Sequence, residues 1–477
     1  MPARRRRTQE LSQSNNHIMS KGLLRNLPSV DDLARVLADR ISLPQPLLVQ
    51  TAREVIDETR ASILADEWNG KTDLAAELEM RSLKRLQGLR SPIAVINATG
   101  VVLHTGLGRA PLSERAVNAI REMAGSYSTL EINQETGERR SRLLYSEELL
   151  KAWTGAPAAH IVNNNAAAML LALQGLARGR KVIIPRAEMV EIGGSFRLPD
   201  ILNASGVKMV EVGTTNKVRI SDFEQGMDED TALLLKVHTS NYRIVGFTEY
   251  PGIEEMVALG RKHHVPVLFD IGSGAGDIYE GRIAADEPLV QQAINAGADL
   301  VAMSGDKLFG GPQAGMLLGN RDIIEQLKKN PLSRALRVDK VTLAALAATL
   351  ELYLEGQDAI EESLPVLSMI KETQDSVRGR AERLLKLLEN KIPNTSFSVI
   401  ETTATVGGGS VPGEEIPSAG VAVQTEKTSA NILSRNLRMG DPPVFGYVLD
   451  DTCTLDLRTV KDAELETLAT AISNVLI

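Results

Sequence analysis

The segment SGDKLFGGPQAG, residues 304–315, sets one lysine among glycines and a proline, where neither a helix nor a strand is favoured. It follows the apolar run ADLVAM, which predicts a buried strand, so Lys307 lies just beyond a strand end. A lysine that forms a Schiff base must reach a carbonyl carbon and give up its proton readily, which favours such a loop over a solvated helix face. Taken alone, a single lysine here is better explained as a surface residue.

Two other strand ends carry groups that complement this lysine. Asp270 follows the strand VPVLF, and the polar run at 163–165 opens a helix after the strand AAHIV. A strand-end carboxylate can hold a protonated pyridine nitrogen, and the N-terminus of a helix can hold a phosphate. Separately, an aspartate that caps a loop and an asparagine that caps a helix are ordinary features. Because strand ends meet at one edge of an α/β sheet, the three together indicate a site for pyridoxal 5′-phosphate.

Further residues are expected around this cofactor. Asn164, Asn165 and Ala166 are predicted to hold its phosphate, and the hydroxyl of Ser304 is placed to bond the same group. His238, in KVHTSNY, and Glu188, in RAEMVEIGG, are alternative candidates for contact with the ring, and the sequence does not choose between them. The adjacent His263 and His264 lack the spacing of metal ligands, so no metal site is expected.

The elements that must position these residues alternate between strands and helices. Short apolar runs that mostly end in glycine or a polar residue are typical of buried strands; they are KVIIPR, GVKMVEVG, TALLLKVH, VPVLFDIG, ADLVAMSG and AGMLLG. The pattern predicts an α/β fold with a mainly parallel sheet covered by helices on both faces. A long helix is expected from about Val341 to Glu355, and a further one over MIKETQDSVRGRAERLLKLLEN.

Changes in pattern along the chain predict its domains. Residues 1–20 form a basic N-terminal segment that is expected to be disordered. Residues 21–90 are expected to form a helical domain, in which Ser29 caps the first long helix. The cofactor-binding catalytic domain is expected at 91–340, a linking helix at 341–365 and a small C-terminal α/β domain at 366–477.

Charge and hydropathy narrow the classes of function. The chain carries a net charge of −8, yet residues 1–90 hold 15 Lys and Arg against 12 Asp and Glu, so a mildly basic module accompanies an acidic body. The longest apolar runs fall short of the ~20 residues that cross a bilayer, and the basic N-terminal segment lacks the apolar core of a signal peptide. A cytoplasmic protein without a membrane partner is expected.

Longer motifs give the chain a resemblance to one family. They include INATGVVLHTGLGRAPLS, VNNNAAAMLLAL, EVGTTN, LLKVHTSNYRIVGFT, DIGSGAG, SGDKLFGGPQAG and TVGGGSVPGEEIPSAG. With them the chain resembles bacterial selenocysteine synthase, the L-seryl-tRNA(Sec) selenium transferase, from about Leu23 to its end. The resemblance implies an aspartate-aminotransferase-like (fold type I) enzyme. It also implies a tRNA-binding role for residues 21–90 and a homo-oligomer built as a ring of dimers.

The resemblance also implies roles for individual residues. Lys307 would be the Schiff-base lysine and general base, with Asp306 beside it, and Asp270 the partner of the pyridine nitrogen. Arg109, Arg334 and Arg337 would hold selenophosphate, since guanidinium groups offer paired donors to an oxyanion. The implied reaction eliminates the serine hydroxyl of seryl-tRNA(Sec) to an aminoacrylyl intermediate and adds selenium to it.

Two other functions are compatible with parts of the sequence. A lyase of a small amino acid or amino sugar phosphate would use the same cofactor residues, but it has no need of residues 21–90. A nonenzymatic tRNA-binding protein on a decayed scaffold would not be expected to keep the lysine, the aspartate and three arginines. The chain departs from the family pattern at Gly106, Ile132, Asn133 and Arg140, all close to the expected substrate end.

Overall fold

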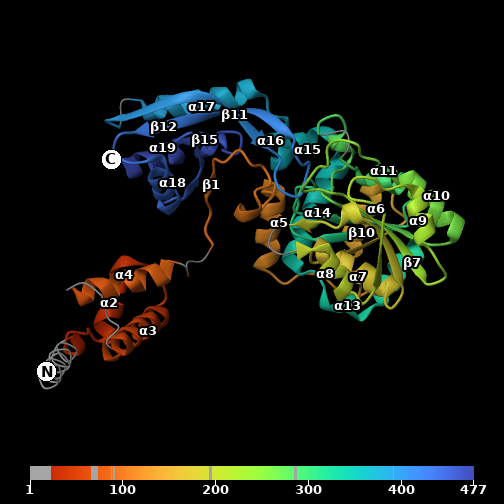
Figure 1. Ribbon diagram of the computed structural model, residues 1–477, viewed down its shortest axis with the longest axis horizontal. Coiled ribbons are helices and arrows are strands. Elements are labelled where there is room, and N and C mark those ends of the chain that lie inside the picture. The colour runs from red at the N-terminus through yellow and green to blue at the C-terminus, as the bar shows by residue number, and fades with distance from the viewer. Residues whose placement is uncertain are drawn as a thin grey trace, which may run out of the picture. The chain divides into compact units, whose positions relative to one another are not determined.

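The computed structural model describes residues 23–65, 73–87, 89, 92–192, 196–283, 287–389 and 392–476, so the predicted basic N-terminal segment lies outside the described residues. The chain divides into two compact units, Met1–Ala94 and Val95–Ile477, whose elements are labelled in Figure 1.

The first unit is a bundle of helices. Its long helices are α2 (Val30–Arg40), α3 (Gln45–Leu64) and α4 (Leu74–Gln87). The hydroxyl of Ser29 accepts a hydrogen bond from the backbone N–H of Asp32, which confirms the predicted N-cap. Leucine, valine, isoleucine and alanine side chains from all three helices form one buried core, while the charged residues stay at the surface.

The second unit is built on a seven-stranded sheet. Its order is β2 (Ala158–Val162), β10 (Gly315–Gly319), β9 (Leu300–Ser304), β8 (Val267–Gly272), β7 (Thr231–Val237), β3 (Lys181–Pro185) and β6 (Lys208–Val212). Every run predicted as a strand is present. Only β10 is antiparallel to its neighbours, so the sheet is mainly parallel, as expected.

Helices cover both faces of this sheet. One face packs against α7 (Asn165–Ala177), α8 (Leu198–Ala204) and α12 (Arg321–Lys329). The other packs against α6 (Leu144–Thr154), α9 (Ile220–Gly226), α10 (Ile253–His263), α11 (Val290–Asn295) and α14 (Lys340–Glu355). Helix α5 (Glu114–Ala124) packs on α14, and the short α13 (Pro331–Ala335) and α15 (Gln357–Ser363) flank that long helix in sequence. The three layers agree with the α/β class predicted from the sequence.

A smaller antiparallel sheet follows near the C-terminus (Figure 1). Its order is β11 (Thr395–Thr405), β12 (Glu415–Thr425), β15 (Thr452–Asp456) and β14 (Tyr447–Leu449), and α17 (Gln374–Leu388), α18 (Ala430–Met439) and α19 (Leu465–Leu476) share its core. The strand pair β1 (Ile96–Asn97) and β13 (Val444–Phe445) joins an early segment of the chain to this region. The short hairpin β4 (Glu191–Ile192) and β5 (Phe196–Arg197) stands apart from both sheets.

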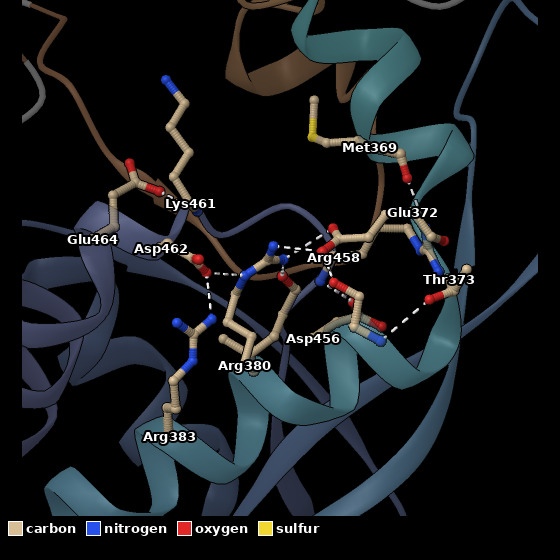
Figure 2. A network of polar contacts seen from close by, with 12 residues as sticks. Met369, Glu372, Thr373, Arg380, Arg383, Asp456, Arg458, Lys461, Asp462 and Glu464 are labelled. Carbon is tan, nitrogen blue, oxygen red and sulfur yellow. Dashed lines mark hydrogen bonds and ion pairs between the residues drawn. The ribbon is translucent and has the colours of Figure 1, made fainter. Parts of the chain in front are cut away.

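The helix expected over residues 369–390 is in fact two helices, α16 (Pro365–Lys371) and α17. The side chain of Thr373 accepts the backbone N–H of Ser376 at 3.3 Å and caps the start of α17. Arg458, only 1% exposed, donates to the carbonyls of Met369 at 2.6 Å and Glu372 at 2.8 Å, at the end of α16 (Figure 2). A guanidinium on these last carbonyls satisfies acceptors that the helix leaves open, so the chain can break there.

The small sheet near Arg458 also contacts the segment from Ala98 to Arg109, which leads to the predicted active site. Asp456, fully buried, accepts from Thr402 and from Ser418, and its backbone N–H donates to the carbonyl of Ala98. Gly100 has φ +73°, and a Cβ there would lie 2.8 Å from the carboxyl carbon of Asp456. The segment that continues to Arg109 is therefore anchored on the small sheet.

Among the described residues, no helix combines the length and apolar character that crossing a membrane requires.

Candidate active site

Neighbouring strand ends place the predicted cofactor residues at one edge of the large sheet. Asp270 lies near the end of β8, Lys307 follows β9, and Asn165 begins α7 after β2. Strands β8 and β9 are adjacent and parallel, so their carboxyl ends meet. Asp270 and Lys307 are both buried, with 7% and 6% exposure. The lysine predicted from its loop is thus not a surface residue.

The amine of Lys307 lies in a narrow, glycine-lined space. A Cβ on Gly409 would stand 2.8 Å from Lys307 Nζ, and one on Gly272 would stand 3.8 Å from it. Burial lowers the pKa of Lys307 below its ordinary value, with Asp270 opposing this shift and Arg109 reinforcing it. A lowered pKa increases the neutral fraction of the amine, which is the form that attacks a carbonyl carbon or accepts a proton.

Asp270 is held by one amide. Asn165 Nδ2 donates to Asp270 Oδ1 at 2.8 Å, while Asn165 Oδ1 is buried without a partner among the described residues. Burial raises the pKa of Asp270, and the bond from Asn165, the nearby Lys307 and His238 and the backbone N–H of Gly272 oppose that shift. A carboxylate whose pKa burial still raises is stabilised further by a cationic N–H donor, which a protonated pyridine ring provides.

The start of α7 has the form of an anion site. Asn164 Oδ1 accepts from the backbone N–H of Ala167 at 2.8 Å, so Asn164 is the helix cap. The N–H groups of Asn165 and Ala166 lie in the first turn, where the helix dipole favours negative charge. A Cβ on Gly315 would lie 2.0 Å from the carbonyl oxygen of Asn164, so glycine there allows β10 to approach this turn.

A second carboxylate lies beside the lysine. Asp306 Oδ2 accepts from Arg109 Nη1 at 2.8 Å, and Asp306 Oδ1 accepts from Ser304 Oγ at 2.7 Å. Arg109 has φ 64°, a conformation that non-glycine residues rarely adopt and that surrounding contacts must hold. The hydroxyl of Ser304 is thus directed to Asp306, and its predicted bond to a phosphate stays a prediction.

His238 and Glu188, the two candidates for ring contact, differ in their partners. His238 Nε2 lies 2.9 Å from Glu287 Oε2, and the backbone N–H of His238, just after β7, donates to the carbonyl of Asp270 on β8. Glu188 instead accepts the backbone N–H of Val237 at 2.6 Å and contacts Lys236 at 3.4 Å; burial raises its pKa. Glu188 therefore holds the end of β7, which favours His238 as the residue that faces the cofactor.

Two residues of this site were not singled out from the sequence. Glu287 is 5% exposed, and its Oε2 also accepts from the backbone N–H of Val411 at 3.3 Å, while its Oε1 has no partner among the described residues. It lies in an ordinary acidic stretch, so no signal marked it. Gly409 belongs to a run of three glycines after β11, a pattern that does indicate close backbone approach.

The arginines predicted to bind the donor anion occur in two places. Arg334 and Arg337 line a cavity of about 420 Å³ together with Arg140 and Arg142. Arg109 does not line that cavity, since it is paired with Asp306 beside the lysine. One copy of the chain therefore brings Arg334 and Arg337 together but keeps Arg109 with the cofactor residues.

Glu131 is the carboxylate around which these cavity arginines gather. It accepts from Arg142 at 2.6 Å and from Arg337 at 3.2 Å. Hydrogen bonds from Arg142 and Arg139 lower the pKa of Glu131 to about 2, so it stays ionised. Five arginines line the cavity against two carboxylates, Glu131 and Glu147, which suits an oxyanion. Arg140, one of the departures from the family pattern, contributes to this lining.

The residues at the sheet edge fit pyridoxal phosphate. The site has a buried lysine with a lowered pKa, a buried aspartate with a raised pKa, and a capped helix N-terminus. Two buried oxygens, on Asn165 and Glu287, have no partner among the described residues, and a Cβ at Gly409 would collide with the lysine. In the described residues no group of His, Cys, Asp and Glu is arranged to hold a metal ion.

Comparisons with known proteins give the family. The model for L-seryl-tRNA selenium transferase (SelA) matches residues 95–461. The chain belongs to this family. An L-seryl-tRNA(Sec) selenium transferase of Aquifex aeolicus (strain VF5) is 43% identical over 459 residues, which cover 96% of this chain and 99% of that protein. One of Alkaliphilus metalliredigens (strain QYMF) is 43% identical over 466 residues, covering 96% and 100%.

Membership of the selenium transferase family confirms the resemblance seen in the sequence and makes the chain a pyridoxal-phosphate-dependent transferase. Among solved structures, a D-glucosaminate-6-phosphate ammonia-lyase is similar with a TM-score of 0.54 and 18% identity, covering 83% of this chain and 98% of that one. At that identity the likeness shows the fold alone, and the predicted fold type I class is confirmed. The alternative of a small-molecule lyase is not favoured.

Proposed function

We propose that this protein converts L-seryl-tRNA(Sec) into L-selenocysteinyl-tRNA(Sec) with selenophosphate as the selenium donor, and that it does so in the cytoplasm. Identity of 43% over 96% of the chain to enzymes named for this reaction supports the proposal. The structural observation that carries it is the buried amine of Lys307, enclosed by Gly272 and Gly409 next to Asp270. Such an amine suits proton transfer at the carbon next to an amino group.

Pyridoxal phosphate, when bound, withdraws electrons from the carbon that loses a proton. Asp270 would keep the ring nitrogen protonated, and the first turn of α7 would hold the phosphate. Lys307 takes the proton from the α-carbon of the seryl group and passes it to the departing hydroxyl. After selenium has bonded, a proton from solvent returns to the α-carbon through Lys307. Asp306, paired with Arg109, opposes the lowering of the Lys307 pKa through its charge, and we assign it an auxiliary role in proton transfer. The hydroxyl leaves the β-carbon as water, selenium bonds there, and water cleaves the phosphorus–selenium bond to give phosphate.

The proposal is tested with purified, cofactor-loaded protein, selenophosphate and two tRNAs. Seryl-tRNA(Sec) should give selenocysteinyl-tRNA, detected after hydrolysis of the ester, whereas ordinary seryl-tRNA should not react. Protein that shows the absorbance of bound cofactor but converts neither tRNA would contradict the proposal. Equal conversion of both would contradict its specificity for tRNA(Sec).

We further propose that the helical unit contacts the tRNA backbone. Arg53 and Lys84 are exposed, and neither has an ion-pair partner among the described residues, so both are available to phosphates. Replacing both with alanine should weaken tRNA binding and lower the slope of log Kd against log salt by roughly 0.7–0.9 for each phosphate that is no longer bound. Filter binding at several salt concentrations measures this. Lys262→Ala, on the catalytic unit, is the control, and an unchanged slope in the double variant would count against the proposed role.

Homo-oligomerisation, with a ring of dimers as the larger assembly, is also proposed, and it explains the separated arginines. In this arrangement Arg337 of one copy completes the site that contains Lys307 of the other copy. A dimer with Lys307→Ala in one copy and Arg337→Ala in the other then has one site with both substitutions and one site with neither. It should then retain about half of wild-type activity. The matched control places both substitutions in the same copy, beside a wild-type partner, and should be nearly inactive. Doubly tagged dimers allow both to be purified, and the reverse ranking would show that each site lies within one copy.

A further inference from the structure

A chain of polar contacts lines the inner part of the cavity that holds Arg334 and Arg337. His160, on β2 and only 4% exposed, places its Nε2 2.8 Å from the Oγ of Ser333. Its Nδ1 lies 3.3 Å from Glu147 Oε1, and the other oxygen of Glu147 accepts from Lys328 Nζ at 3.0 Å. Glu147 on α6 is 6% exposed, so the imidazole contacts a buried carboxylate through one nitrogen and the serine hydroxyl through the other.

Ser333 belongs to the segment that presents the two arginines. Helix α13 includes Ser333 and Arg334, and Arg337 follows within one turn. Five residues make too short a helix to hold itself in place, since isolated helical turns are unstable without packing. External contacts must therefore fix the direction in which its arginines point.

Other contacts of this segment are apolar or go to its backbone. Leu332 and Leu336 pack against the core of the large sheet. The N–H of Asn163 donates to the carbonyl of Leu336 at 3.1 Å, and Arg142 donates to the carbonyl of Val338 at 3.0 Å. Within α13, the bond from His160 to Ser333 is a polar side-chain contact with the sheet. Residue 160 also lies on the strand that ends just before Asn164, at the predicted phosphate turn.

We infer that His160 and Ser333 are positioning residues for the selenium donor: their hydrogen bond fixes α13 on β2 and so aims Arg334 and Arg337 into the cavity. The inference rests on the proposed function, because it concerns how that donor is held. His160 lines the cavity, but its hydrogen bonds among the described residues go to Glu147 and Ser333 and not to the arginines, so we assign its effect on them to the bond with Ser333. Glu147, in turn, orients the imidazole toward the serine.

The test compares His160→Phe, Ser333→Ala and the double variant. Loss of one hydrogen bond that fixes the helix should raise the KM for selenophosphate about three- to tenfold in each. Activity at saturating donor, the absorbance of the bound cofactor and the Kd for seryl-tRNA should stay at wild-type values. The double variant should equal the single ones, because both substitutions remove the same hydrogen bond. His263→Phe, an exposed histidine bonded to Glu224, is the matched control.

Binding of inorganic phosphate to the holoenzyme, measured by calorimetry, gives a readout that does not depend on turnover. Its Kd should rise by the same factor in His160→Phe and Ser333→Ala. An unchanged KM for selenophosphate and an unchanged Kd for phosphate would overturn the inference. An equal loss of turnover, tRNA binding and thermal stability would also overturn it, because such a loss indicates that the residues serve the fold alone. Absence of selenium transfer by the wild-type protein would instead reject the proposed function, while the phosphate measurement would still test the positioning role.

Discussion

Replacing Lys307 with alanine should abolish selenium transfer and remove the visible absorbance that the cofactor shows when it is bound to a lysine. Nothing else among the described residues at this strand end offers a buried amine, and loss of a general base alone costs about 10²–10⁴-fold in rate. Because Asp270 and the turn of α7 remain, the cofactor should still bind, with the absorbance of its free aldehyde. Absorbance spectra and single-turnover assays measure both effects.

Two controls make this result specific to the site. Lys262→Ala removes an exposed lysine that pairs with Glu224 and should leave spectrum and rate unchanged. Lys236→Ala removes a half-buried lysine at the end of β7, bonded to Glu188, and should keep the absorbance. A Lys307→Ala protein that retains the wild-type spectrum would exclude Lys307 as the residue that binds the cofactor.

The sequence predicts Lys307 and Asp270 as cofactor-binding residues because both stand at the ends of expected strands. Each follows an apolar run long enough for a buried strand, and in a parallel sheet such ends meet at one edge. Local signals of this kind also give Ser29 as a cap and the strands of the large sheet. The rule depends on neighbours in sequence and on sheet geometry, both of which can be read from a single chain.

Contacts between distant parts of the chain could not be predicted in this way. Gly409 lies about a hundred residues beyond Lys307, and nothing local says that its backbone faces the amine. The break between α16 and α17 depends on Arg458, which reaches the carbonyls of Met369 and Glu372 from a later strand end. Helical periodicity continues through the break, and its local signal is the cap residue Thr373, while the contact that satisfies the end of α16 comes from a distant residue.

The arginines show a related limit. The family resemblance implies that Arg109, Arg334 and Arg337 bind the same anion. In the structure of one copy, however, Arg109 has different neighbours from the other two arginines. Arg109 belongs with Asp306, and Arg337 belongs with Glu131. Residues that act on one ligand need not meet within one copy of an oligomer. This is why the mixed-dimer experiment, and not sequence pattern, decides whether they act together.

The backbone at Gly409 gives the second large effect that we expect. A Cβ there would lie 2.8 Å from Lys307 Nζ and 3.1 Å from its Cε, and the residue has φ +86°. Gly409→Ala should therefore displace the lysine and strain the loop, since both the contact and the positive φ disfavour a side chain. A displacement of about 1 Å at a reacting group costs roughly 10²-fold in rate. The rate at saturating substrates and the cofactor spectrum should both change, with little change in the Kd for tRNA.

The neighbouring glycine supplies a matched control for this variant. A Cβ on Gly408 would meet only the methyl carbon of Thr105, at 3.7 Å, which is an ordinary contact. Gly408→Ala should thus retain most of the wild-type rate, although it changes the same loop by the same single methyl group. If Gly409→Ala were as active as Gly408→Ala, the lysine would have to lie elsewhere when the cofactor is bound. A large difference between the two variants would tie the rate to the contact with Lys307 and the positive φ that are specific to Gly409, because loop flexibility alone affects both positions.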